Sequence, residues 1–208
     1  MSAVETSPGD TIAYTLHGNR YLNITSACTL RCAFCPKFNK TWDVRGYHLK
    51  LSDKAGPGVE AIMAAVGDPR EYGEIVFCGL GEPTLRWQVM LEVARRLKAR
   101  GAKIRLNTDG LANLVNGRDV TAEMAGLIDA LSISLNAQNE DLYIRHCRPK
   151  KEGAYAAMLD FARRAKAHVP EVTLTAINGL EGVDIEACRA IAADLGVAFR
   201  QRELDVVG

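Results

Sequence analysis

Three of the six cysteines in the chain fall within eight residues, in the stretch CTLRCAFC, at Cys28, Cys32 and Cys35. Thiols this close together can ligate zinc or an iron–sulfur cluster, can form a disulfide, or can simply be buried. A disulfide would leave one of the three thiols over. A metal centre is therefore the chemistry that this stretch favours.

The spacing C-x3-C-x2-C separates the kinds of metal centre. A structural zinc site takes four ligands, and His17 or His48 could supply the fourth, but the sequence holds no second C-x2-C pair. The bacterial ferredoxin run has a shorter first gap and a later fourth cysteine. Three thiolates on one loop suit three irons of a cubane cluster and leave the fourth iron without a protein ligand. Such an open position is what a catalytic metal needs, so the spacing favours a 4Fe–4S centre.

A second group of residues follows the short apolar run EIVFCG, in the segment FCGLGEPT. Gly79 and Gly81 would let the backbone approach a ligand closely. Glu82 places a carboxylate where an ammonium group could be held. The simpler interpretation is a strand-to-loop turn with an exposed glutamate.

Further polar residues follow later apolar runs. Asn107 lies in RLNTDG, with Asp109 a less certain member of the same group, and Ser134 and Asn136 lie in SISLNA. Ser134 and Asn136 are two residues apart on a strand and so share a face. The alternatives are an Asp-Gly turn for the first segment and satisfied core hydroxyls for the second.

The elements that would position these residues alternate regularly along the chain. An N-terminal hairpin turns at His17–Asn19, and residues 36–58 are expected to form an irregular loop. Strands are predicted at Thr11–Leu16, Arg20–Thr25, Glu74–Gly79, Lys103–Asn107, Ala130–Leu135, Glu171–Ile177 and Val197–Leu204. Helices are predicted at Val59–Val66, Leu85–Arg100, Ala122–Ile128, Gly153–His168 and Ile185–Leu195.

This rhythm predicts βαβ units around a parallel sheet. About six units are present, whereas a closed eight-unit barrel takes about 250 residues, so we expect an α/β fold with a partial, open (β/α)6 barrel. One domain is expected over residues 1–208, with residues 1–19 as a strand and turn that precede the barrel. Ligands of such sheets bind at the carboxyl ends of the strands, where the polar residues above are found.

Composition argues against several classes of function, although it leaves room for a local basic patch. The formal net charge of +1 argues against a strongly basic nucleic-acid surface, and no apolar run approaches the length that spans a membrane. The first ten residues lack the features of a secretory signal. We therefore expect a cytoplasmic protein whose thiols stay reduced. Cys78, Cys147 and Cys188 have no ligand spacing and are expected to be buried structural cysteines.

The pattern C-x3-C-x-Φ-C, with Phe34 as the aromatic residue, resembles the signature of the radical S-adenosylmethionine (radical SAM) enzymes. The resemblance implies that Cys28, Cys32 and Cys35 bind a 4Fe–4S cluster and that SAM chelates the unique iron. One electron from the reduced cluster would then cleave SAM to a 5′-deoxyadenosyl radical, which takes hydrogen from a substrate.

The same resemblance implies roles for the strand-end residues. The segment at Gly79, Gly81 and Glu82 is similar to the family's GGEP motif, which binds the SAM amino group. Asn107, Ser134 and Asn136 would hold the ribose and the carboxylate of SAM. The adenine would lie against the Phe34 backbone and Ile177, the latter in a segment that loosely resembles the family's G-x-I-x-G-x-x-E sequence.

Several segments, among them YLNIT, FCGLGEPTLR and SISLNA, look most similar to the TatD-associated radical SAM proteins. This resemblance implies an unassigned substrate, an electron donor such as flavodoxin or ferredoxin, and a functional link to a TatD-type hydrolase. One alternative is an activase or peptide-modifying enzyme with a protein partner, and another is a non-catalytic iron–sulfur or zinc module. The alternation of Arg200, Gln201 and Arg202 fits either a substrate contact at the barrel mouth or a solvated edge strand.

Overall fold

The structure, a computed structural model, describes residues 9–38, 41–53 and 55–204. Both ends of the domain expected over 1–208 therefore lie outside the described residues, as do positions 39, 40 and 54 of the predicted loop. Among the described residues, no helix is long and apolar enough to cross a membrane.

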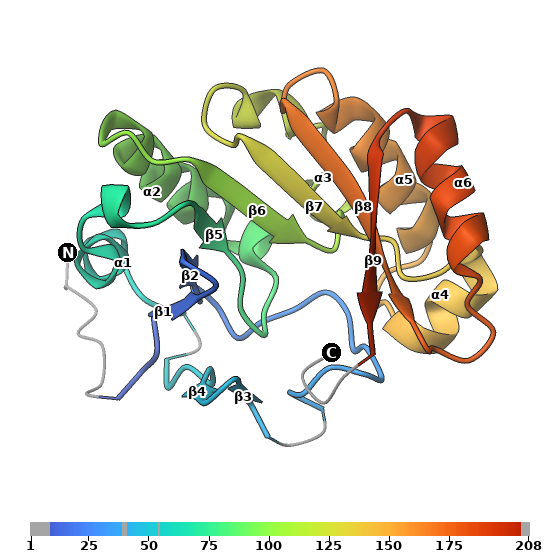
Figure 1. Cartoon of the computed structure of the whole chain (residues 1–208), viewed down its shortest axis with the longest axis horizontal. Coiled ribbons are helices and arrows are strands. Elements are labelled where there is room, and N and C mark those ends of the chain that lie inside the picture. The colour runs from blue at the N-terminus through green and yellow to red at the C-terminus, as the bar shows by residue number, and fades with distance from the viewer. Residues whose placement is uncertain (1–8, 39–40, 54, 205–208) are drawn as a thin grey trace.

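One seven-stranded sheet, in the order β1-β2-β5-β6-β7-β8-β9, organises the chain (Figure 1). In this sheet β1 and β2 pair antiparallel, and β2, β5, β6, β7, β8 and β9 pair parallel in that order. β1 and β9 are the two edges, so the sheet is open and the predicted partial barrel with an N-terminal hairpin is confirmed. The strands are Ala13–Leu16 (β1), Asn19–Leu22 (β2), Ile75–Phe77 (β5), Ile104–Thr108 (β6), Ala130–Ser134 (β7), Glu171–Asn178 (β8) and Ala198–Glu203 (β9).

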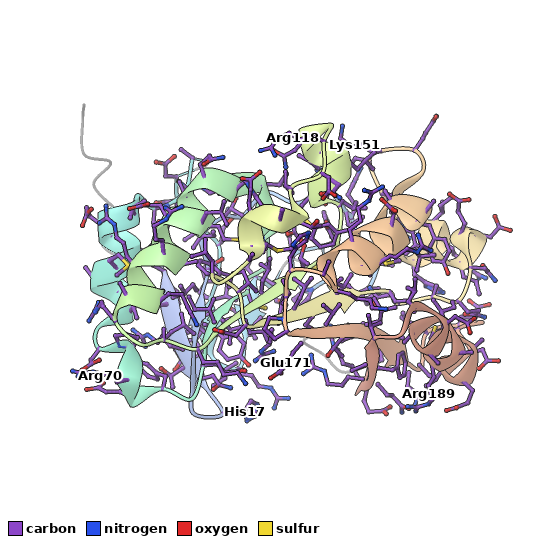
Figure 2. All side chains as sticks on the ribbon, turned by 90° about the horizontal axis from the view of Figure 1, so that it is seen from above. His17, Arg70, Arg118, Lys151, Glu171 and Arg189 are labelled. Carbon is purple, nitrogen blue, oxygen red and sulfur yellow. The ribbon has the colours of Figure 1, made fainter. Side chains whose placement is uncertain are left out.

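Helices cover one face of this sheet, and the opposite face is left to line a cavity (Figures 1 and 2). β6 shows why, because its apolar residues Ile104 and Leu106 are buried while Arg105 and Asn107, which alternate with them, are only half-buried. The α-helices are Val59–Val66 (α1), Trp87–Ala99 (α2), Ala112–Asn116 (α3), Glu140–Cys147 (α4), Ala154–Ala165 (α5) and Ile185–Leu195 (α6).

The helix predicted at Ala122–Ile128 is wrong. The structure has a 3-10 turn at Thr121–Met124 and a short α3 before it. The Asp119 side chain accepts hydrogen bonds from the backbone and hydroxyl of Thr121, which starts the turn. Gly126, with φ +71°, ends it before a second helical turn can form.

Besides α3, the structure contains a helix and a small hairpin that were not predicted. α4 begins at Asn139, whose side chain accepts a hydrogen bond from the Leu142 backbone, so an N-cap signal was present in the sequence. The segment predicted as an irregular loop contains a small hairpin of β3 (Asp43–Val44) and β4 (Tyr47–His48). Arg45 and Gly46 both have positive φ between these strands, as a tight hairpin turn requires.

Candidate active site

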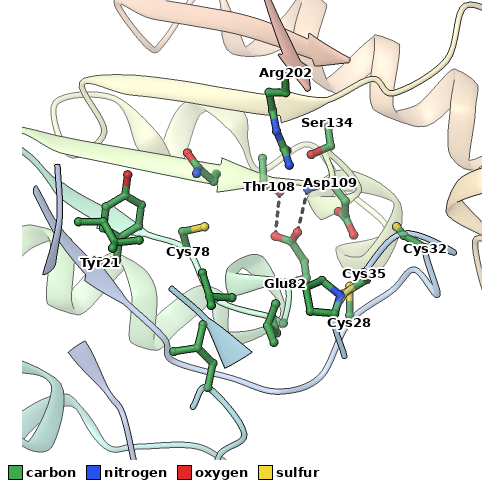
Figure 3. Close-up of a pocket in the computed structure, with 18 of the residues that line it drawn as sticks. Tyr21, Cys28, Cys32, Cys35, Cys78, Glu82, Thr108, Asp109, Ser134 and Arg202 are labelled. Carbon is green, nitrogen blue, oxygen red and sulfur yellow. Dashed lines mark hydrogen bonds between the residues drawn. The ribbon is translucent and has the colours of Figure 1, made fainter. Parts of the chain in front are cut away.

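A cavity of about 620 Å³ lies at the carboxyl ends of the parallel strands. Ten of the eleven residues that the sequence predicted for the site line it (Figure 3). These are Cys28, Phe34, Cys32, Cys35, Gly79, Gly81, Glu82, Asn107, Ser134 and Asn136. The cavity therefore gathers residues from the loop after β2 and from the ends of β5, β6 and β7.

The cysteine loop is held against the C-terminal end of α4 by backbone hydrogen bonds. Arg31 N donates to Cys147 O at 3.0 Å, and Ala33 N donates to His146 O at 2.8 Å. The helix that sequence analysis missed is thus the support of the loop that carries the three thiols. Its last residue, Cys147, is fully buried, as predicted for that cysteine.

All three thiols line the cavity, but they are not close enough together to form one set of metal ligands. Within the described ranges, no three His, Cys, Asp or Glu side chains are arranged as a metal site. Figure 3 shows that the Cys32 side chain lies apart from those of Cys28 and Cys35. The Cys32 thiol hydrogen-bonds with Cys147 instead. Cluster binding by all three cysteines would require Cys32 to leave that hydrogen bond.

Burial and nearby negative charge disfavour the thiolate form of these cysteines. Burial, followed by the carboxyls of Asp109 and Glu82, raises the pKa of Cys28 to about 12. Burial also raises the pKa of Cys35, and the hydrogen bond with Cys147 together with burial raises that of Cys32. Bound iron would supply the positive charge that compensates these thiolates.

Gly79 and Gly81 allow a close approach, but their neighbours are residues 23–27 of the chain itself. A Cβ on Gly81 would lie 2.1 Å from Thr25 O and 2.6 Å from Ala27 O. A Cβ on Gly79 would lie 2.3 Å from the Asn23 side chain. Glu82 N donates to Ala27 O at 2.7 Å in the same contact. The absence of side chains at these glycines therefore lets the GLGEP segment pack against residues 23–27, which directly precede the cysteine loop.

Glu82 is buried and ties two strand ends together. Its carboxylate accepts hydrogen bonds from the Thr84 backbone N (3.0 Å) and Thr84 Oγ1 (2.7 Å), from Thr108 Oγ1 (2.8 Å) and from Asp109 N (2.8 Å). The first pair caps the 3-10 turn Pro83–Arg86, and the second pair reaches the end of β6. The exposed glutamate of the simpler interpretation is wrong, because Glu82 is only 3% exposed and its hydrogen bonds join the segment after β5 to the end of β6.

Asp109 stands beside Glu82 and gives the cavity a second buried carboxyl. It accepts a hydrogen bond from Thr29 Oγ1 on the cysteine loop and another from Leu111 N at 3.0 Å. Burial, and then the charge of Glu82, raises the pKa of Asp109. Burial likewise raises the pKa of Glu82, against the opposing effect of its four donors. Two carboxyls in one buried place are stabilised as anions when a cation binds beside them.

Asn136 has a hydrogen-bonding group that no described residue satisfies. It takes a left-handed backbone conformation, with φ +59°, directly after β7. Its Nδ2 donates to Cys147 Sγ at 3.6 Å, whereas its buried Oδ1 has no partner among the described residues. An unpaired acceptor in a cavity wall marks a place where a ligand donor can bind.

Ile177 is the predicted residue that does not line the cavity. It is fully buried in β8. The adenine contact suggested for it therefore stays a prediction. Residues that were not assigned to the site, Arg105 and Cys78, line the cavity beside Asn107. The sequence could have indicated Arg105, because it lies two residues before Asn107 on the same strand and therefore shares its face.

The residues present fit a thiolate-bound cluster and a zwitterionic cosubstrate. Three thiols of one loop face a cavity with room for a small molecule. Beside them lie two carboxyls suited to an ammonium group and an unpaired Asn136 oxygen suited to a hydroxyl or amino donor.

The family model of the radical SAM superfamily matches residues 22–195, which is most of the chain. The chain therefore belongs to the radical SAM superfamily, a class of enzymes whose members bind a 4Fe–4S cluster and SAM. The predicted class, fold and cofactors are thereby confirmed at the level of the superfamily.

Two curated relatives resemble parts of the chain. A stretch of 140 residues is 30% identical to 7-carboxy-7-deazaguanine synthase of Halobacterium salinarum and covers 67% of this chain and 46% of that protein. A stretch of 93 residues is 30% identical to the tungsten-containing aldehyde ferredoxin oxidoreductase cofactor-modifying protein of Pyrococcus furiosus, over 43% of this chain and 23% of that protein. The matched stretches thus span about a quarter to a half of the length of these relatives.

Solved structures show the same fold at low identity. TYW1 with a lysine-pyruvate adduct bound superposes with a TM-score of 0.63 at 16% identity, over 90% of this chain and 65% of that chain. SuiB of Streptococcus suis bound to S-adenosylmethionine superposes with a TM-score of 0.61 at 13% identity, over 89% of this chain and 38% of that chain. At such identities the likeness concerns the fold alone.

Proposed function

We propose that this protein binds a 4Fe–4S cluster through Cys28, Cys32 and Cys35 and cleaves SAM reductively, to act on a substrate yet to be assigned. The observation that carries the proposal is the single cavity in which three thiols of one loop meet polar groups from three successive strand ends. A protein that only carried a cluster would not need those strand-end groups.

When bound, the cluster supplies one electron for the cleavage of SAM to a 5′-deoxyadenosyl radical. The protein's own part is to place SAM. Glu82 and Asp109 stabilise its ammonium group, since both carboxyls face the cysteine end of the cavity. Asn136 Oδ1 accepts a hydrogen bond from SAM in place of the partner that it lacks.

The remaining assignments keep the residues that the family resemblance implies. Asn107 and Ser134 hold the ribose or carboxylate, Phe34 and Ile177 border the adenine, and Gly79 and Gly81 shape the ammonium side. We include in the proposal a single domain over residues 1–208, membership of the TatD-associated group, a functional link to a TatD-type hydrolase, a flavodoxin or ferredoxin electron donor and a cytoplasmic location. Similarity of the segments around the motifs and the expected reducing compartment support these points.

A protein substrate is the second candidate. β9 pairs with β8 on one side only, and four of its six residues are exposed. Such an edge can accept an extended peptide by strand addition beside the cavity. In that case the enzyme would be an activase or a peptide-modifying enzyme.

The test is an EPR spectrum of anaerobically reconstituted, dithionite-reduced protein with and without SAM, with 5′-deoxyadenosine measured in the same sample. We expect a cubane signal that SAM shifts, and slow release of 5′-deoxyadenosine. The Cys32→Ala variant should lose both. A wild-type cluster indifferent to SAM, or bound zinc, would favour the non-catalytic binding module instead.

A further inference from the structure

The loop that carries the three cysteines has one side on the cavity and another side on the solvent. Cys28, Cys32 and Cys35 line the cavity. Arg31 and Phe38 belong to the same segment, but both are exposed and neither lines the cavity. A molecule that binds on the solvent side is therefore separated from the thiols only by the loop itself.

Two cations lie against the exposed ring of Phe38. The guanidinium carbon of Arg31 is 5.9 Å and Lys37 Nζ is 5.6 Å from the centre of this ring. A backbone hydrogen bond from Phe38 N to Cys35 O at 2.9 Å holds the ring beside the loop, and 39% of the residue is exposed. An aromatic ring and two cations thus lie at the surface directly after the last of the three cysteines.

Two more cations reach the loop from the segment that follows α4. Lys150 Nζ donates a hydrogen bond to Cys28 O at 2.7 Å. Arg148 is exposed and directly follows Cys147, whose carbonyl oxygen accepts a hydrogen bond from Arg31 N. The solvent side of the loop is therefore surrounded by cations. We define the loop patch as Arg31, Lys37, Phe38, Arg148 and Lys150.

The positive charges of the loop patch are not neutralised within the part of the chain that the structure describes. None of its four cations forms an ion pair with a described carboxylate. By contrast, Arg145 of α4 pairs with Glu181 at 2.8 Å. Lys151 and Glu152, which follow the patch, carry opposite charges and leave its excess unchanged. Because the whole chain has a formal net charge of only +1, the patch is a local basic surface.

We propose that the loop patch is the docking surface for a small acidic protein that carries one electron to the cluster. The inference rests on the proposed function and names the partner that this site needs for its reduction. Complementary charges speed and orient the encounter of two proteins, and aromatic and arginine side chains are enriched where proteins meet. On docking, the reduced carrier loses one electron and the cluster gains it, and no bond forms or breaks.

The position and the size of the patch favour an electron carrier over a nucleic acid. Arg31 is the direct neighbour of Cys32, so a protein docked there lies next to a proposed cluster ligand. Four cations can neutralise only a few phosphates, which gives a nucleic acid little affinity. Redox partners, in contrast, commonly meet through small and transient interfaces.

The experiment measures the binding of two purified carriers, an oxidised bacterial ferredoxin and an oxidised flavodoxin, to the anaerobically reconstituted protein by isothermal titration. The cluster is kept oxidised and SAM is left out, so that neither electron transfer nor cleavage occurs. The variants are Arg31→Glu and Arg148→Glu, because neither guanidinium group has a hydrogen bond or ion pair to a described residue that its loss would strand. The iron content and the SAM affinity of each variant are measured alongside.

Arg70→Glu is the matched control. Arg70 is as exposed as the two patch arginines, and it lies in the turn before the amino end of β5, whereas the cysteine loop lies at the carboxyl ends of the strands. The substitution changes the net charge of the protein by the same amount. It therefore separates the effect of the patch from that of total charge.

We expect at least one carrier to bind saturably, and added salt should weaken this binding because it screens the charges. Reversing one exposed charge of the interface should make binding by Arg31→Glu and by Arg148→Glu about 3-fold to 20-fold weaker. Arg70→Glu should match the wild type. With the reduced carrier as electron source, the ratio of carrier-driven to dithionite-driven release of 5′-deoxyadenosine should fall in both patch variants.

The inference is overturned if neither carrier binds saturably, or if Arg31→Glu and Arg148→Glu both bind the carriers as tightly as the wild type. It is also overturned if these variants lose affinity for a mixed-sequence single-stranded RNA but not for the carriers, because the patch would then bind nucleic acid. Failure of the wild type to release 5′-deoxyadenosine with dithionite refutes the proposed function. Release with dithionite and no binding of a carrier refutes this inference alone.

Discussion

Gly81→Ala tests whether the close packing beneath the cysteine loop is required for the site. The new Cβ would lie 2.1 Å from Thr25 O and 2.6 Å from Ala27 O, and both atoms belong to the backbone. The two segments must separate by about 1 Å to restore ordinary contact. That movement breaks the 2.7 Å hydrogen bond from Glu82 N to Ala27 O.

The expected cost follows from these contacts. Overpacking against rigid backbone costs about 1–3 kcal/mol and the lost hydrogen bond about 1 kcal/mol, together about 2–4 kcal/mol of the free energy of unfolding. With a urea slope of about 2 kcal/mol/M, the unfolding midpoint should fall by about 1–2 M. Cys28 follows Ala27 directly, so the iron content after anaerobic reconstitution should fall as well.

Gly58→Ala is the matched control. No atom lies within 4 Å of a Cβ at Gly58, and its φ is −69°. The substitution removes only a weak helix cap and should cost a few tenths of a kcal/mol. The reasoning is refuted if the Gly81→Ala and Gly58→Ala proteins unfold at the same urea concentration and bind equal amounts of iron.

Three further substitutions separate the roles of neighbouring residues. Glu82→Gln replaces one carboxylate oxygen by an amide N–H₂, which in the Oε2 position faces the donor Asp109 N. The free energy of unfolding measured in urea should therefore fall by about 1–3 kcal/mol; an unchanged value would mean that this network does not support the fold. Asn136→Gly keeps the left-handed backbone and removes the unpaired oxygen, so SAM binding measured by titration should weaken while the urea midpoint stays within about 0.5 M; tighter or equal SAM binding would remove Asn136 from the site. Cys147→Ala frees Cys32 from its hydrogen bond and should leave the iron content per chain unchanged; loss of iron would assign Cys147, in place of one of the three loop cysteines, to the cluster.

Local patterns in the sequence predicted the metal chemistry and the fold class. The spacing of Cys28, Cys32 and Cys35 limits which metal centres they can form, whatever lies around them. The alternation of apolar and polar residues in β6 reports which face is covered, because side chains of a strand alternate between the faces. Such signals span a few residues, and they were read correctly for the sheet and for most of the helices.

Errors arose where local signals conflicted or were short. The stretch Ala122–Ile128 has helical composition, but Gly126 takes a positive φ and limits it to a 3-10 turn. The eight residues of α4 have a clear N-cap at Asn139 and a weak apolar stripe. That helix matters for the site, since its end anchors the cysteine loop.

By itself, the sequence determined the strands of the large sheet, most of the helices and the three thiols on one loop. Only the tertiary structure decided that Glu82 binds the end of β6, that the glycines pack against residues 23–27, and that Arg105, Arg200 and Arg202 line one cavity. The physical reason is that these arrangements bring together residues from 26 to nearly 100 positions apart. No local periodicity records such a pairing, because it depends on how the parallel strands align once the sheet has formed.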